Sequence, residues 1–210
     1  MSLERRRVLL VHGLGRTPLS LVLLARRLSR EGYRPETFGY YAFAESHQRI
    51  VLRLARRLQI LATTSEPVSL LGHSLGGLLL RQAAALVPEL RIHSLIMLGT
   101  PNQPPLLARR VRHWTAFRML TRSCGDFLAT PDAFATLAPP ACRYLLIAGD
   151  AGWRGRWNPF EGAPNDGFVA VDETRIDPAD SPVVLPVAHT FMMNSPAVQE
   201  AILEALGAGD

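Results

Sequence analysis

The apolar positions of the chain follow two patterns that alternate from its beginning to its end. Short apolar segments rich in Val, Ile and Leu lie at 6–13, 33–40, 67–74, 92–100, 142–150 and 181–189, and several are almost continuously apolar, as in strands covered on both faces. Segments with helical spacing lie at 18–31, 46–62, 75–87, 104–122 and 196–206. This alternation predicts an α/β protein, a three-layer α/β/α sandwich around a mainly parallel sheet of about six strands.

The polar residues and glycines that interrupt this pattern follow the ends of the predicted strands. Because parallel strands end at the same edge of a sheet, and ligands bind beyond these carboxyl ends, we expect the residues to meet on one rim. In chain order they are His12 and Gly13 after the first strand, Ser74 after the third, Thr100 and Pro101 after the fourth, Asp150 and Asp166 after the fifth, and His189 after the sixth.

The segment from Gly72 to Gly76 reads G-x-S-x-G and stands between a predicted strand and a predicted helix. A tight turn there forces Ser74 into a strained backbone conformation, and neighbours without side chains allow strand and helix to approach closely. The hydroxyl is thereby lifted clear of the sheet, and the helix N-terminus faces any negative charge that develops beside it. The pattern predicts a nucleophilic serine.

A serine is a weak nucleophile near neutral pH, so it needs a base, and the base needs an acid that orients it. In sheets of this type the order along the chain is Ser, then Asp or Glu, then His. His189 ends the last predicted strand and is the expected base. Asp166 stands before a sharp turn and an apolar anchor and is the preferred acid, with Asp150 and Asp172 as alternatives.

Acyl transfer also needs hydrogen-bond donors for an oxyanion. We expect these to be the backbone N–H of Leu75, at the start of the helix, and that of Leu14, in the glycine-containing loop after the first strand. This loop does not fit a nucleotide-binding motif, because no third glycine and no Gly-Lys-Ser/Thr sequence follows. The candidate substrate-binding residues are His12, Gly13, Trp114 and Phe168.

Composition narrows the classes of function. The 210 residues are 48% hydrophobic, and no apolar run approaches the roughly 18 residues of a membrane span. The N-terminal segment lacks the features of a secretory signal, so we expect a cytoplasmic protein. All 23 basic residues are arginines, scattered along the chain without interleaved stacking residues, so nucleic acid is not an expected partner. Cys124 and Cys142 are expected to be free thiols, and neither a metal nor a cofactor is expected.

The predicted helix at 104–122 has an apolar stripe of Leu107, Val111, Trp114 and Phe117, beside several arginines. We interpret it as a cap helix that packs over the sheet with its arginines in solvent. The alternative is a lid or a surface that makes transient contact with anionic lipid.

These segments together resemble the α/β-hydrolase superfamily, in particular its small lipases and esterases. The resemblance spans nearly the whole chain and rests on LLVHGLG, LLGHSLGG, IMLGTPNQ, NDGFVAVDET and VAHTFMMNSPAV. It implies one domain over 1–210 with a small cap at about 101–141. It also implies Ser74 as nucleophile, Asp166 as acid, His189 as base, and Leu14 with Leu75 as oxyanion donors.

The expected function is cleavage of carboxylic esters through an acyl-enzyme intermediate, with a small acyl ester or a lipid as substrate and a monomer or weak dimer as the active form. A thioesterase and a membrane-lipid deacylase are alternatives within the same chemistry. A catalytically silent binding protein with the same fold is the alternative from another class.

Overall fold

The computed structural model describes residues 6–64 and 66–208 and places six parallel strands in one sheet within them. The strands are β1 (Arg7–Val11), β2 (Arg34–Phe38), β3 (Val68–His73), β4 (Ile92–Leu98), β5 (Tyr144–Gly149) and β6 (Val183–Leu185). Their order across the sheet is β2-β1-β3-β4-β5-β6. The prediction of a parallel sheet of about six strands is confirmed.

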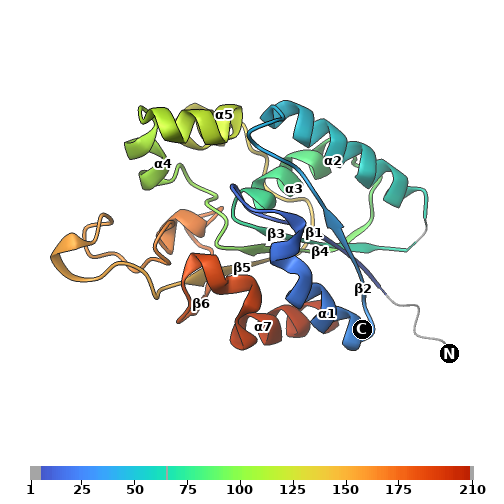
Figure 1. The fold of residues 1–210 in the computed structure, drawn as a ribbon. Helices are drawn as coiled ribbons and strands as arrows, with labels where there is room; N and C mark the ends of the chain where they lie inside the picture. The colour runs from blue at the N-terminus through green and yellow to red at the C-terminus, as the bar shows by residue number, and fades with distance from the viewer. Residues whose placement is uncertain (1–5, 65, 209–210) are drawn as a thin grey trace.

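Helices cover both faces of the sheet (Figure 1). The α-helices are α1 (Val22–Arg30), α2 (His47–Ala62), α3 (Leu75–Ala85), α4 (Leu106–Val111), α5 (Thr115–Ala129), α6 (Pro131–Ala135) and α7 (Pro196–Gly207). Short 3-10 helices are η1 (Pro18–Leu21), η2 (Gly155–Trp157), η3 (Asp172–Thr174) and η4 (His189–Asn194). Helices α1 and α7 lie on one face, whereas α2 and α3 lie on the other, which gives the predicted three layers.

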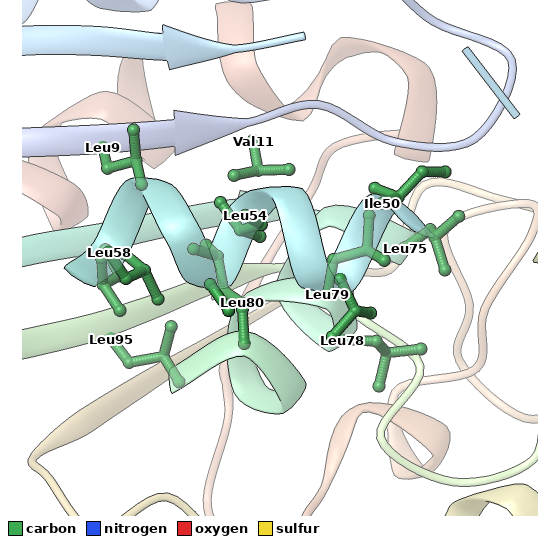
Figure 2. Packing of buried hydrophobic residues seen from close by; sticks show 14 of the residues in the cluster. Leu9, Val11, Ile50, Leu54, Leu58, Leu75, Leu78, Leu79, Leu80 and Leu95 are labelled. Carbon is green, nitrogen blue, oxygen red and sulfur yellow. The ribbon is translucent and has the colours of Figure 1, made fainter. Parts of the chain in front are cut away.

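The packing of α2 and α3 on the sheet fixes the position of the strand ends. Figure 2 shows Leu54 and Leu58 of α2 in one cluster with Leu79 and Leu80 of α3, and all four are fully buried. Helix α3 is apolar on almost every side because α2 covers the face that the sheet leaves open. The N-terminus of α3 is therefore held rigidly at the carboxyl end of β3.

Two predicted elements differ from the structure. The single helix expected at 104–122 is two helices, α4 and α5, separated by a turn in which the N–H of Trp114 donates to the carbonyl of Val111. The periodicity does not reveal this break, because Val111 before it and Phe117 after it line the same cleft. The strand expected at 181–189 ends at Leu185, because Pro186 has no N–H with which to continue the ladder.

Within the described residues, none of the helices combines the length and the apolar character that crossing a membrane requires.

Candidate active site

Ser74 stands at the corner between β3 and α3 with φ 53° and ψ −126°, a conformation that costs a residue with a side chain about 1–3 kcal/mol. Its N–H donates to the carbonyl of Leu98 at 2.8 Å, which ties the corner to β4. A Cβ on Gly72 would lie 2.3 Å from the nitrogen of Gly77, and one on Gly76 would lie 2.3 Å from the carbonyl oxygen of Val11. The glycines of the pattern are required by the close approach of strand and helix.

The side chains of His189 and Asp166 form a short hydrogen bond, with Nδ1 of His189 donating to Oδ2 of Asp166 at 2.6 Å. Both side chains are buried. The second carboxylate oxygen accepts from the backbone N–H groups of Phe168 at 2.9 Å and Val169 at 2.8 Å. The N–H of His189 also donates to the carbonyl of Asp166 at 2.9 Å. The turn at 166–169 therefore fixes the carboxylate, and through it the imidazole.

The two alternative acids lie in other environments. Asp150 directly follows β5, and its Oδ1 is buried without a hydrogen-bond partner in the described part of the chain. Asp172 lies in η3, where its exposed carboxylate pairs with Nε of Arg175 at 3.2 Å. Of the three candidates, the structure pairs Asp166 with His189.

Ser74 and His189 line one cleft of about 840 Å³ beyond the carboxyl ends of the strands. Leu14 lines it from the loop after β1, and Phe168 from the turn that holds the acid. Much of the remaining wall is apolar and comes from the segment between β4 and β5, with Leu107, Ala108, Val111, Phe117, Leu120 and Leu128. We call residues 101–141 the cap segment. The arrangement places a hydroxyl and an imidazole beside an apolar cavity.

The family comparison matches residues 8–208 to the alpha/beta hydrolase family. The chain belongs to the alpha/beta hydrolase family. No curated protein matches the sequence. The family fold agrees with the six-stranded parallel sheet and with the expectation from the sequence motifs.

Solved structures of a lipase, a phospholipase and a thioesterase superpose on most of the chain. The mature lipase BlEst2 from Bacillus licheniformis is 18% identical with a TM-score of 0.76, over 98% of this chain and 93% of that chain. The phospholipase PlaB from Legionella pneumophila is 16% identical with a TM-score of 0.71, over 97% and 60%. YbtT, a type II thioesterase from the yersiniabactin pathway, is 13% identical with a TM-score of 0.63, over 98% and 93%. At these identities the likeness shows the fold.

In this alpha/beta hydrolase, His12 holds the loop after β1 through contacts on the buried side of that loop. Its ring is fully buried, stacks on Tyr40 with centroids 4.2 Å apart, and its Nδ1 donates to the carbonyl of Gly13 at 2.9 Å. The sequence predicts His12 as a substrate-binding residue, but its buried ring is not among the described residues that line the cleft. Its contacts instead shape the loop that carries Leu14. Gly13 itself packs tightly, since a Cβ there would lie 2.8 Å from Nδ1 of His73.

Two other expected site residues lie at the start of α3 and on the surface. Leu75 is the first residue of α3 and directly follows Ser74, as the oxyanion prediction requires. Trp114 is 66% exposed at the start of α5 and is not among the described residues that line the cleft, unlike Leu107 and Phe117 of the same predicted stripe. Trp114 is therefore a surface residue of the alpha/beta hydrolase instead of part of the cleft wall.

His73 supports the backbone of His189. The sequence indicates only that His73 belongs to the turn at Ser74. Its Nε2 donates to the carbonyl of His189 at 3.0 Å, and the two rings lie 4.7 Å apart. Burial holds the pKa of His73 well below its usual value, and the neighbouring His189 lowers it further. A neutral His73 can hold the backbone of His189 without placing a second positive charge beside it.

Gly99 is a second supporting residue that the sequence analysis did not identify. It follows β4 with φ 53°. A Cβ at this position would lie 3.0 Å from both Oδ2 of Asp166 and Nδ1 of His189, the two atoms of the short hydrogen bond. The only signal in the sequence is a glycine at the end of a strand on the predicted rim.

Replacing Gly99 with alanine is expected to lower the kcat of a reaction that uses His189 as a base by about 10- to 100-fold, because the added methyl group pushes His189 and Asp166 apart. The matched control is Gly32→Ala, which has a φ of 89° but open space around the added Cβ. It should lose stability to urea without losing kcat. Equal kcat in both variants would show that Gly99 does not position the pair.

Proposed function

We propose that this hydrolase cleaves carboxylic esters, with Ser74 as nucleophile, His189 as general base and Asp166 as the acid that orients the base. The observation that carries the proposal is the 2.6 Å hydrogen bond from His189 to Asp166, in a cleft that Ser74 lines from a strained corner. Arg122 and Glu161 also have positive φ, but of these three residues it is Ser74 that lines the cleft. Backbone strain at a polar residue in a cleft is typical of a functional site. The sequence order of the three residues fits the same role.

In the proposed reaction, the Oγ of Ser74 attacks the ester carbonyl while Nε2 of His189 takes its proton. Asp166 stabilises the resulting imidazolium, and the N–H groups of Leu14 and Leu75 hold the oxyanion. The tetrahedral intermediate expels the alcohol, which receives the proton from His189. Water, activated by His189, then attacks the acyl-enzyme, releases the carboxylic acid and restores the hydroxyl of Ser74.

The cleft favours an aliphatic acyl chain over a polar or charged one. Its cap-segment wall is formed largely by Leu, Val, Ala and Phe side chains. A second hollow of about 620 Å³ shares His189 and Phe168 with the cleft and is bordered by Trp153 and Trp157. His189 therefore borders two hollows with largely apolar walls.

The test is a hydrolysis profile over p-nitrophenyl esters from acetate to palmitate, together with thioesters of matched acyl groups, with Ser74→Ala as the control. We expect kcat/KM to rise from acetate to longer acyl chains and the oxygen esters to be cleaved at least as fast as the thioesters. A marked preference for thioesters would replace the assignment with a thioesterase. Hydrolysis that persists in Ser74→Ala would remove the proposed nucleophile.

A further inference from the structure

The positive charge of the chain is concentrated in two segments at the cleft. Of the 23 arginines, five lie within residues 104–122 and two within residues 151–160, and neither segment contains Asp or Glu. The other 16 arginines are outnumbered by the 18 acidic residues. All seven arginines of the two segments are exposed. The acidic residues nearest to these segments in the sequence are Asp126, Asp150 and Glu161.

The same two segments expose large apolar side chains. They contain all three tryptophans of the chain, Trp114, Trp153 and Trp157, of which Trp157 is 75% exposed. Met119 and Leu120 of α5 are about as exposed, at 71% and 69%. Side chains of this size are normally covered in a folded domain, and a group of them on one surface indicates a docking site.

The loop that carries two of the tryptophans is tied to the candidate active site. Its sequence from Trp153 to Trp157 is WRGRW, and the guanidinium of Arg156 lies 5.1 Å over the ring of Trp157. The indole N–H of Trp153 donates to the carbonyl of Gly167 at 2.9 Å, next to Asp166. In Figure 1 the orange loop after β5 projects from the body of the molecule on the same side as α4.

Both segments open onto the same cavities. Leu107 of α4 borders the hollow that Trp153, Trp157 and His189 also line, and Leu120 of α5 lines the main cleft. A flat partner that contacts the tryptophan loop and the cap segment together would therefore lie across the mouth of the cleft. We call the exposed arginines and apolar residues of 104–122 and 151–160 the arginine–tryptophan surface.

We propose that the arginine–tryptophan surface docks the protein on an anionic lipid bilayer, and that the ester substrate enters the cleft from that bilayer. Docking needs only the surface, whereas the identification of the substrate as a lipid ester rests on the proposed function. Arginines near an anionic leaflet each contribute about 1 kcal/mol of attraction. Tryptophan rings favour the boundary between headgroups and acyl chains.

The apolar side chains favour a bilayer over other acidic partners. The tryptophans beside Arg154 and Arg156 correct the expectation that no stacking residues are interleaved with the arginines, and such rings can also stack on nucleic-acid bases. Met119 and Leu120, in contrast, offer no stacking face. Their side chains are suited to acyl chains, and they lie beside a cleft whose walls are themselves apolar. Charge attracts the bilayer and the apolar residues enter it, so binding should need both.

The three tryptophans make docking directly measurable, because every indole of the chain lies on the proposed surface. The full chain carrying Ser74→Ala, which cannot consume the lipid, is titrated with vesicles of phosphatidylcholine alone or mixed with phosphatidylglycerol, at low and at high salt. We expect a blue shift of tryptophan emission and co-sedimentation with the anionic vesicles. High salt should weaken this binding, and phosphatidylcholine alone should bind little.

A matched pair of charge variants locates the surface. The four changes Arg110→Gln, Arg112→Gln, Arg154→Gln and Arg156→Gln should lower partition into anionic vesicles by about a thousand-fold, at about 1 kcal/mol for each arginine removed. The control removes the same charge from exposed positions elsewhere, with Arg26→Gln, Arg30→Gln, Arg34→Gln and Arg56→Gln, and should change partition only a few-fold. Both variants should cleave a soluble p-nitrophenyl ester at the rate of the parent enzyme.

Four outcomes would overturn the proposal: no blue shift with anionic vesicles, equal binding to both vesicle types, an equal loss in the two charge variants, or a response to an oligonucleotide without one to vesicles. The last would identify a polyanion site. If the protein cleaved the soluble ester but did not bind vesicles, the docking proposal would be wrong and the proposed function would stand. If the protein bound anionic vesicles but the parent chain cleaved no ester, the proposed function would be wrong and the docking proposal would stand.

Discussion

Replacing Ser74 with alanine is expected to lower kcat on p-nitrophenyl esters by about four orders of magnitude or more, because no other group then forms the acyl-enzyme. Ser74→Gly should be equally inactive. It should be the more stable of the two by about 1 kcal/mol, since glycine adopts a φ of 53° without a steric cost. Steady-state kinetics and urea unfolding measure the two effects on the same pair of proteins.

The pair separates catalysis from folding. Equal loss of turnover with different free energies of unfolding shows that Ser74 acts chemically and that its backbone is strained. If alanine and glycine variants were equally stable, the strain would not be stored at this residue. If either variant kept a hundredth of the original kcat, another nucleophile would have to be sought.

Replacing Asp166 with asparagine is expected to lower kcat by about 10⁴-fold while the fold is kept. The asparagine oxygen can still accept the N–H groups of Phe168 and Val169. Its NH₂ group then faces Nδ1 of His189 in place of the carboxylate oxygen, and the imidazole must accept there. The proton moves to Nε2, so the ring can no longer take the proton of Ser74.

The matched control is Asp150→Asn, which removes the acid that the sequence left as the first alternative. Because Asp166 already holds His189, this variant should keep kcat within a few-fold of the parent. Near-UV circular dichroism of both variants checks the fold. An inactive Asp150→Asn beside an active Asp166→Asn would reverse the assignment of the acid.

The layers of the fold could be predicted from the sequence because apolar residues recur with a different spacing in strands and in helices. Strands β3 and β4 are apolar on both faces, and α2 carries an apolar stripe with a cap at Ser46, so each is marked locally. The break between α4 and α5 has no comparable signal in the sequence. Residues on either side of it still face one cleft, so the amphipathic pattern continues across the turn.

The residues of the candidate site could be predicted where a reactive side chain stands in a recognisable sequence pattern. Ser74 stood in a recognisable pentapeptide, and His189 ended the last predicted strand. The supporting contacts could not be predicted, because they join segments that are far apart in sequence. Gly99 matters through what a Cβ would touch, and His73 through a carbonyl that lies 116 positions further along the chain.

The link between the cap segment and the acid is another contact of this kind. The carboxylate of Glu173 accepts from the N–H of Leu106, at the start of α4, at 2.7 Å and from that of Ala170 at 2.9 Å. Burial raises the pKa of Glu173, with backbone donors acting in the opposite direction. No local pattern marks this residue, although it joins the cap segment to the loop that contains Asp166.

Covalent labelling with a fluorophosphonate tests the central claim, that Ser74, His189 and Asp166 form one reactive unit, most directly. Intact-mass spectrometry and peptide mapping should find a single adduct on Ser74 in the parent protein, none in Ser74→Ala, and much slower labelling in Asp166→Asn than in Asp150→Asn. An adduct on a different residue, or no adduct at all in the folded parent protein, would contradict the account.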